Sequence, residues 1–404
     1  MYRYYYSNPN ERILHGDNIW NVCVIDNIDF KEKTFSYDNI FDVARRTAHA
    51  TLRMVFQFTL PKPLSEIVSR TDNNTNFEFQ VGISSLVKDQ LKKFERIICL
   101  LIESHNRNFD VADVRTELRK ITDIGCNIPQ PNVVILESGD NPCNNENVHN
   151  AAKMYFNDIG INGLGHIDLV ADEAIFRRLI SLHETHPEIR PLLGAWHTNK
   201  SMCTTLIAIF SGYGIFKLAA VLGVSYFDKL EKVVDYPATC RVLELIWVAV
   251  GIAITLYTKN KNITMQDIFY GQNEVLKVWY LYFCWAGFWI GHKLGIRFGN
   301  HDIQIENLTA FMPLFPIVGR SNYAQSTTHF LSYVKSNSSL KMLLDHVCSV
   351  NLTRPGHFFA FDEALETFGV KYIKQNIGRV LGNQEDLKSR ISSVQSEQGR
   401  INLC

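Results

Sequence analysis

The sequence lacks an excess of charge of either sign, and its cysteines lack close pairing. Lysine plus arginine number 41, as do aspartate plus glutamate, so the net charge of zero neither favours nor excludes a polyanionic partner. The nine cysteines are odd in number and include no CxxC pair, which argues against a disulfide framework and a compact zinc site. This cysteine usage indicates a reducing compartment, so we expect the nucleus or the cytoplasm.

Uninterrupted apolar runs of membrane-spanning length are also missing. The start, MYRYYYSNPNER, has no apolar core of a signal peptide, so we expect a protein that is not secreted. The three prominent uncharged runs have 16, 14 and 14 residues and lie at Ser201–Phe216, Leu245–Thr258 and Val278–Gly291. A spanning helix needs about 20 apolar residues, so these runs predict buried helices of a large protein without membrane contact. An integral membrane protein is the less favoured interpretation.

What the sequence does have is enough apolar residues for one large domain or two ordinary ones. Hydrophobic residues make up 46% of the 404 positions. Short apolar or alternating runs predict strands at Trp20–Ile25, within Arg45–Leu60, at Asn132–Leu136 and at Ile167–Val170. Apolar residues at helical spacing predict helices at Asp89–His105, Val111–Ile121, Val148–Asp158, Glu173–His186, Ser321–Lys335, Leu340–Val350 and Phe361–Val380.

The order of these elements predicts an α/β fold with a helical insertion. From Leu192 to Ile290 the pattern is helical and apolar, and no strand alternation interrupts it. The expected parts of the chain are a surface segment at 1–19, a mixed-sheet core at 20–190, a mainly helical insertion at 191–354, a final core helix at 355–383 and a polar, disordered tail at 384–404.

Three acidic residues from distant parts of the chain could meet in this core. Asp26 and Asp172 each follow an apolar strand, and Glu366 lies on the last helix. Strand ends hold side chains rigidly next to the loops where α/β folds place their sites. Phosphoryl transfer on nucleic acid uses two divalent ions about 4 Å apart, and Mg²⁺ prefers carboxylate oxygens. Solvated strand ends and helix caps are the alternative interpretation of the same acids.

Helix and strand geometry guides the choice among neighbouring acids. Asp362 and Glu366 are four residues apart and share a helix face, whereas Glu363 points about 100° away from Asp362. Asp362 also suits the first turn of a helix, which leaves Glu366 as the better metal ligand and Asp362 as a supporting group. Asp168 shares a strand face with Asp172 and competes with it. We prefer Asp172 because Asp168 precedes the apolar run.

Other residues are candidates for orienting the acids or contacting a substrate. Asn27 and Asp29 lie beside the first acid, although a turn-forming role fits them equally. His197 could contact DNA or support the site, but a hydrogen-bonded core histidine is the favoured interpretation. Asn322 and Tyr323 could line a substrate groove or form a helix-packing pair.

Four short blocks, taken in order, resemble a known family. They are Asp26-Asn27 after an apolar strand, Asp172 followed by GAWHT at 194–198, SNYA at 321–324, and Gly356 followed by Asp362-x-x-x-Glu366. From about Asn21 to Lys374 the chain is similar to a fungal transposon-derived family of unknown function. That family groups with cut-and-paste transposases that carry a DDE-type, ribonuclease-H-like catalytic domain.

The resemblance implies a fold, a chemistry and a partner. It implies a ribonuclease-H-like core with a helical insertion, in which Asp26, Asp172 and Glu366 hold two Mg²⁺ or Mn²⁺ ions. It also implies cleavage and transfer of DNA strands, in which a water and then a 3′-hydroxyl attacks a phosphodiester. DNA is then the expected partner, and a homo-oligomer is compatible with this function.

The chain departs from the family pattern at three points. Ala171 and Glu173 flank the second acid, where relatives tend to carry a glycine and a polar residue. Related superfamilies often have a cysteine or aspartate three residues before the histidine that matches His197, and here that position is Gly194. No zinc-finger or helix-turn-helix pattern precedes the first strand. These departures favour, as the alternative, a catalytically inactive relic that binds DNA or protein.

Overall fold

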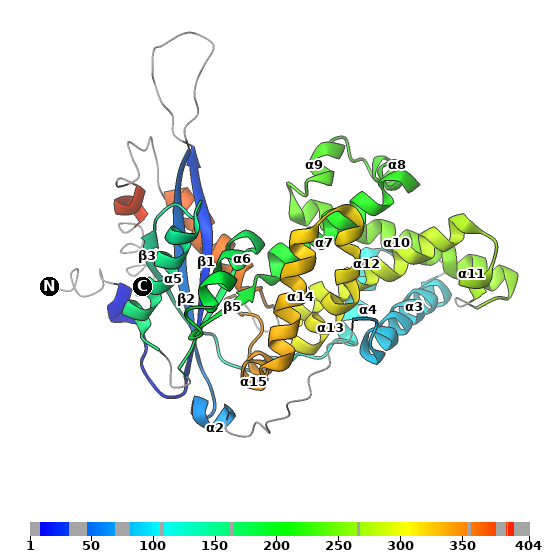
Figure 1. Ribbon diagram of the computed structural model, residues 1–404. Helices are drawn as coiled ribbons and strands as arrows, with labels where there is room; N and C mark the ends of the chain where they lie inside the picture. The colour runs from blue at the N-terminus through cyan, green and yellow to red at the C-terminus, as the bar shows by residue number, and fades with distance from the viewer. Residues whose placement is uncertain are drawn as a thin grey trace, which may run out of the picture.

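Five strands form one mixed sheet, and helices make up most of the other regular structure (Figure 1). The strands are β1 (Ile19–Lys31), β2 (Thr47–Thr59), β3 (Asn132–Gly139), β4 (Ile167–Ala171) and β5 (Ile189–Leu193). Their order across the sheet is β3-β2-β1-β4-β5. β2 runs antiparallel to β1 and β3, whereas β4 runs parallel to β1 and β5. The mixed α/β class expected from the sequence is confirmed.

The computed structural model describes residues 9–31, 47–68, 81–105, 109–161, 165–264, 267–353, 357–376, 385 and 387–391. Gly356 of the fourth sequence block and most of the predicted tail at 384–404 lie outside this part. Within that tail, residues 387–391 are helical, and Leu387 and Ile391 are fully buried in an apolar cluster on the sheet. Their spacing of four gives the segment one apolar face, so disorder was the wrong prediction for these residues.

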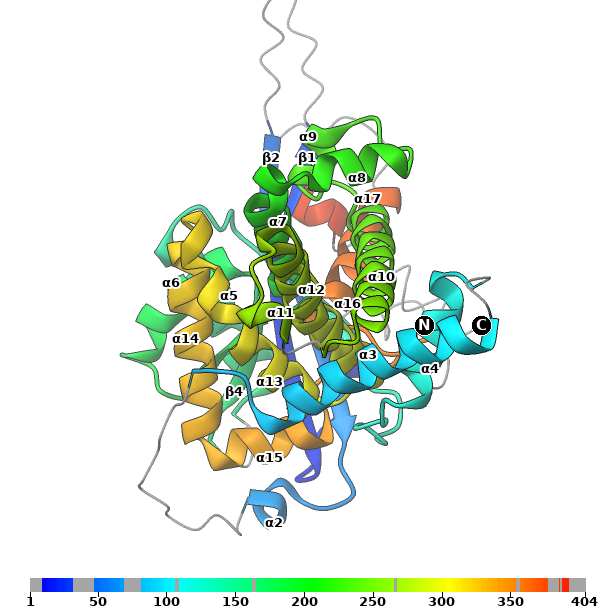
Figure 2. The same ribbon diagram turned by 90° about the vertical axis from the view of Figure 1, so that its right-hand side faces the viewer.

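The helices either cover the sheet or form a body beside it (Figures 1 and 2). Those on the sheet are α2 (Leu64–Val68), α5 (Asn145–Ile159), α6 (Glu173–His183), α14 (Ser321–Ser336), α15 (Ser338–His346), α16 (Phe361–Ala364), the π-helical segment η5 (Leu365–Val370) and α17 (Lys371–Asn376). Those of the helical body are α3 (Ser85–His105), α4 (Val111–Lys120), α7 (Ala195–Phe210), α8 (Ile215–Val221), α9 (Phe227–Glu231), α10 (Tyr236–Lys261), α11 (Asp267–Tyr270), α12 (Glu274–Phe298) and α13 (His301–Phe311). Short 3-10 turns are η1 (Pro9–Arg12), η2 (Ser211–Tyr213), η3 (Met312–Leu314) and η4 (Pro316–Val318).

Helices cover both faces of the sheet because strand residues alternate between the faces. Cys23 and Ile25 of β1 belong to the apolar cluster that includes residues of α5 and α6. Val22 and Val24 belong to the opposite cluster, which includes residues of α16, η5 and α17. The helical segment that begins with α16 and continues through η5 therefore packs against the strand that carries the first acid.

β1 continues past the point where its apolar run ends. The run stops at Ile25, but antiparallel pairing with β2 continues as far as Lys31. Pairing with β4 on the other side stops where Ile25 meets Ala171. The polar residues that follow stay in the strand because β2 supplies backbone hydrogen bonds whatever side chains they carry. Asp26 therefore lies where the parallel pairing ends, within the strand rather than after it.

β5 is missing from the sequence-based prediction, which began a helical region at Leu192. The strand has five residues, and one of them is Pro191. Proline donates no backbone hydrogen bond and is confined to sheet edges, and β5 is an edge strand. Short length and the proline hide this strand in the sequence, whereas its pairing along β4 defines it in the structure.

The helical body includes two helices from the segment expected to form the sheet core. α3 and α4 precede β3 in the chain, yet their apolar residues pack with α10 and α12. Phe94 of α3 meets Trp247 of α10 edge-on, with ring centroids 5.5 Å apart. Gly251 permits this close packing, since a β-carbon there would lie 2.4 Å from Ile98 Cδ1. The boundary predicted at residue 191 therefore does not separate the two units.

The apolar runs of the sequence lie in α7, α10 and α12. By length and composition, α10 is long and apolar enough to cross a membrane. The segment from α7 to α8 is bent by 98° and passes the same test only if its two parts are counted as one span. Of the α10 window, 61% is buried inside the protein. α10 also carries the buried Glu244, which pairs with Arg115 of α4 and Lys293 of α12.

Candidate functional site

Asp26 and Asp172 are neighbours at one end of the sheet. Ile25 of β1 and Ala171 of β4 form the last pair of the parallel ladder, so the next residues are Asp26, still within β1, and Asp172, directly after β4. Adjacent strands are roughly 4.8 Å apart, and this register therefore brings both acids to one place. Only 6% of the surface of Asp26 is exposed, and the backbone N–H of Asn27 donates to Asp26 Oδ1 over 2.7 Å.

Asp172 also has a structural contact. It is the N-cap residue of α6, and its Oδ1 accepts a hydrogen bond of 2.8 Å from the backbone N–H of Ile175. A carboxylate in this position meets the positive end of the helix dipole. The helix cap considered from the sequence is thus present. The cap bond occupies one carboxylate oxygen, and a carboxylate has a second oxygen for a further contact.

Glu366 comes from a helical segment near the other end of the chain that packs on the same strands. α16 packs against β1 and β4, and η5 packs against β1 and β2. Glu366 is the second residue of η5, where the helix widens into π-helical hydrogen bonding. Such π-turns re-aim side chains and are frequent at functional sites. Gly369 allows η5 to lie close to β2, because a β-carbon there would lie 2.9 Å from Met54 Cε.

The ionisation of Asp26 depends on both other acids. The pKa of Asp26 is raised from 3.8 to about 7. Burial is the main cause, the charge of His197 opposes it, and the charges of Asp172 and Glu366 add to it. Among the described residues, these three acids do not form a group whose ligand atoms all lie within 4.8 Å of one another. Two ions about 4 Å apart need a wider set of ligands than a single ion does. These three side chains therefore do not form a compact site for a single ion.

His197 supplies the positive charge next to these acids. Its ring Nδ1 and Asp362 Oδ2 are 3.1 Å apart, and the side chain is 21% exposed. Burial lowers the pKa of His197, but the hydrogen bond to Asp362 and the charges of Asp26 and Asp172 outweigh burial and raise the pKa to about 9. The histidine is hydrogen-bonded, as the sequence-based interpretation favoured. It is also a cation at neutral pH, which that interpretation did not include.

Asp362 caps the N-terminus of α7 rather than that of its own helix. Its carboxylate accepts from the backbone N–H of Trp196 over 3.1 Å and from that of His197 over 2.9 Å. α16 itself begins at Ala360 without a side-chain cap. Gly194 makes room, since a β-carbon there would lie 2.5 Å from Asp362 Oδ2. The Asp362 carboxylate therefore occupies the space that a side chain at position 194 would need.

Asp168, the rival for the second acid, is engaged elsewhere. Its oxygens accept two hydrogen bonds of 2.7 Å from the guanidinium of Arg190 and one of 2.8 Å from the indole N–H of Trp20. Both side chains of the ion pair are fully buried. These contacts give Asp168 a structural role and leave Asp172 as the acid beside Asp26. Sequence reasoning missed Arg190, although an arginine inside an apolar run such as IRPLL signals a buried partner.

Asn27 and Asp29 do not form the turn that the sequence allowed. Both lie inside β1, and Asn27 Nδ2 donates to Asp29 Oδ1 over 2.6 Å. The ring of His49 on β2 also contacts Asp29 Oδ1. The Asn27 side chain therefore extends along the strand, and it is the backbone of Asn27 that contacts the Asp26 carboxylate.

Tyr323 of α14 borders the site, whereas its neighbour Asn322 is exposed. The hydroxyl of Tyr323 donates to the carbonyl of His197 over 3.5 Å. Burial, followed by the charges of Asp172 and Glu173, raises the pKa of Tyr323. Of the two candidates, Tyr323 is thus the one whose surroundings include an acid of the site.

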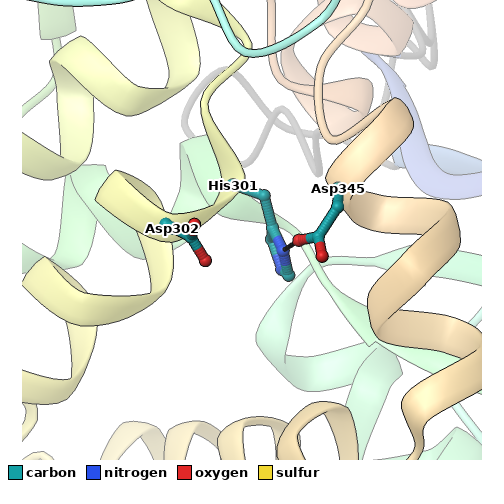
Figure 3. Close-up of side chains that lie close together, drawn as sticks. All are labelled: His301, Asp302 and Asp345. Carbon is teal, nitrogen blue, oxygen red and sulfur yellow. Dashed lines mark hydrogen bonds and ion pairs between the residues drawn. The ribbon is translucent and has the colours of Figure 1, made fainter.

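A second group, at the junction of α13 and α15, has the donor atoms of a small metal site (Figure 3). Ligand atoms of His301, Asp302 and Asp345 all lie within 4.8 Å of one another. His301 Nδ1 and Asp345 Oδ1 are 2.6 Å apart, and the ammonium of Lys341 lies 2.9 Å from Asp345 and 3.8 Å from Asp302. A lysine that lies within ion-pair distance of both carboxylates favours an ion-pair network over a bound cation. No spacing motif marks these residues in the sequence.

No protein-family model, curated protein or solved structure matches the chain. The family resemblance drawn from the four sequence blocks therefore stays an expectation.

Proposed function

We propose that this site carries out divalent-metal-dependent cleavage and transfer of DNA strands, in a ribonuclease-H-like domain of the DDE transposase type. The observation that carries the proposal is the register of β1 and β4, which makes Asp26 and Asp172 neighbours. Glu366 supports it from a third element, because its charge contributes to the raised pKa of Asp26. A mixed sheet on which α16 and η5 pack against β1 is compatible with the expected core, and the part of the helical body that follows β5 is compatible with the expected insertion.

The donor set suits Mg²⁺ or Mn²⁺. All three proposed ligands, Asp26, Asp172 and Glu366, offer carboxylate oxygens, which these hard cations prefer. A buried carboxylate among like charges is unfavourable unless a cation compensates it, and burial already raises the pKa of Asp26 to about 7. When bound, the ions would supply Lewis-acid polarisation of the phosphodiester and activation of the attacking oxygen.

The remaining groups hold the site in place and balance its charge. The His197 cation can donate to a phosphate oxygen of a bound strand, since charged donors form strong hydrogen bonds with phosphate. Asp362 holds the His197 ring through Nδ1 and is itself held by two amides of α7. Asp172 is held by its cap contact with α6. Fixed side chains of this kind keep ligands in place before substrate binds.

An inactive relic that binds DNA or protein is the second candidate. Two observations favour it: Asp172 already caps α6, and the three acids are not gathered within 4.8 Å of one another. Such a protein could keep the fold and the histidine cation while binding no metal. DNA is the partner proposed for the enzyme and DNA or a protein for the relic, with the nucleus or cytoplasm as the compartment.

Nicking of supercoiled plasmid by the purified chain tests the catalytic proposal. We expect nicking with Mg²⁺ or Mn²⁺ and none with EDTA. Asp26→Asn and Glu366→Gln should each lower the rate at least about 100-fold, because each removes a proposed ligand. Asp29→Asn, a charge-matched change on the same strand, should keep the activity. Metal-independent nicking, or equal rates in the first two variants and wild type, would contradict the proposal.

Calorimetric titration with Mn²⁺ separates the two candidates if no nicking is seen. The proposed site should bind Mn²⁺ in the wild type and in Asp29→Asn but not in Asp26→Asn. Absence of Mn²⁺ binding in the wild type would favour the relic.

A further inference from the structure

We infer that a cavity in the helical body binds an organic phosphate monoester with an apolar body. The cavity has a volume of about 760 Å³ and lies between α4, α10 and α12. Small-molecule sites usually have volumes of roughly 300–1,000 Å³, with apolar walls and a few placed polar groups. The carboxylate site of the proposed function does not line this cavity, so the inference goes beyond that function.

The inner wall of the cavity is apolar. Val114 and Leu118 come from α4, Trp247 and Val248 from α10, and Ile290 from α12, and all five are buried. The indole ring of Trp247 belongs to this wall and is held by stacking on the ring of Phe283, with centroids 5.1 Å apart. An apolar or aromatic group of a ligand would be removed from water against this wall.

The rest of the lining carries an excess of positive charge. Five basic side chains line the cavity against two acidic ones, which leaves three positive charges in excess. The basic residues are Arg115, Arg119, Arg241, Lys293 and Arg297, and the acidic ones are Glu244 and Glu363. An anionic ligand is therefore favoured over a neutral or cationic one.

Both acids of the lining are already neutralised. Glu244 pairs with Arg115 and, at 2.7 Å, with Lys293. Glu363 accepts two hydrogen bonds from the guanidinium of Arg297, at 2.8 and 2.5 Å. These pairs account for three of the five basic side chains and still leave a positive charge on the Glu244 group.

Arg119 and Arg241 provide the charge for a ligand. Both are exposed, and neither forms an ion pair with a carboxylate in the part of the chain that the structure describes. Guanidinium groups bind phosphate through paired N–H donors. A phosphate monoester carries more negative charge than a carboxylate and therefore matches the positive excess of the cavity lining better. These features select a phosphate head group with an apolar body.

The cavity also reaches α16, which continues into the segment η5 that carries the proposed third acid. Arg297 lines the cavity and holds Glu363, which directly follows Asp362 on α16. A phosphate that attracts Arg297 would compete with Glu363 for the same donors. Phosphate binding in the cavity would thereby weaken the contact between Arg297 and α16.

Calorimetric titration of the full chain with 2-naphthyl phosphate in EDTA tests the inference. We expect saturable binding with one molecule per chain. Inorganic phosphate lacks the apolar body and 2-naphthol lacks the charge, so each should bind at least tenfold more weakly. Equal binding of 2-naphthol would overturn the assignment of a phosphate site. The assay uses no metal or DNA, so its result does not depend on the proposed strand cleavage.

Matched variants locate the binding. Arg119→Glu combined with Arg241→Glu should weaken binding of 2-naphthyl phosphate at least tenfold, and Ile124→Asp at the exposed rim should weaken it as well. Lys232→Glu combined with Lys261→Glu changes the net charge equally at exposed positions that do not line the cavity, and should bind like wild type. Wild-type affinity in the arginine variant, or an equal loss in the lysine control, would overturn the inference. Circular dichroism checks that each variant is folded.

Discussion

Replacing Asp26 with asparagine should stabilise the metal-free protein at neutral pH. In the folded protein the pKa of Asp26 is about 7, above the ordinary 3.8, mainly because the side chain is buried. Between these values the folded state holds a proton that the unfolded state has released, so the free energy of unfolding falls as pH rises. Asparagine has the shape of protonated aspartate and no charge to bury. The free energy of unfolding of the variant should therefore not show this fall as pH rises.

The magnitude follows from the two pKa values. The difference between about 7 and 3.8, at 1.36 kcal/mol per pH unit, corresponds to about 4 kcal/mol. The loss begins near the lower value and is complete above the higher one. The two proteins should thus differ by less than about 1 kcal/mol near pH 4 and by about 4 kcal/mol near pH 8. Solvent screening changes this little, since Asp26 is only 6% exposed.

Urea denaturation in EDTA between pH 4 and pH 8 measures this effect. The range stays below the His197 pKa of about 9, so the histidine remains charged in the folded state. Asp29→Asn serves as the control for an acid-to-amide change at an exposed position of the same strand. A constant stability difference between Asp26→Asn and wild type would refute the buried, acid-surrounded position of Asp26.

Two further substitutions test the groups around the site. Asp168→Ala should lower the free energy of unfolding by about 3–5 kcal/mol, because Arg190 is then a buried charge without its partner; a loss below about 1 kcal/mol in urea denaturation would contradict this account. Gly194→Ala should displace the Asp362 carboxylate from the amides of α7 and cost about 1–3 kcal/mol. The same change should lower the pKa of His197, which an NMR titration of the ring follows, and an unchanged pKa would disprove the role of Asp362.

Local patterns in the sequence were sufficient for most strands and helices of the core. The apolar runs before Asp26 and Asp172 are strands, because a buried strand needs little more than such a run. The strand that contains Pro191 was missed, since its five residues are too few to show a period. As metal ligands, Asp26, Asp172 and Glu366 remain predictions, and the structure adds the register and the shared electrostatics that motivate their test.

Several roles near the site could not be predicted from neighbouring residues. Asp362 has the sequence position of a cap for its own helix, but its carboxylate caps α7. Gly194 looked like a departure from the family pattern, but in space it makes room for that same carboxylate. The cause in both cases is a contact between residues far apart in the chain.

Apart from β5 and the helical residues 387–391, the sequence by itself determined most of the extended and helical segments, because strand and helix periods are properties of a few consecutive residues. It also determined the apolar content that α7, α10 and α12 bury. Only the tertiary structure decided the register that makes Asp26 and Asp172 neighbours, the pairing of Asp168 with Arg190, and the placement of α3 in the helical body. These depend on packing and charge between distant segments, which no local pattern encodes.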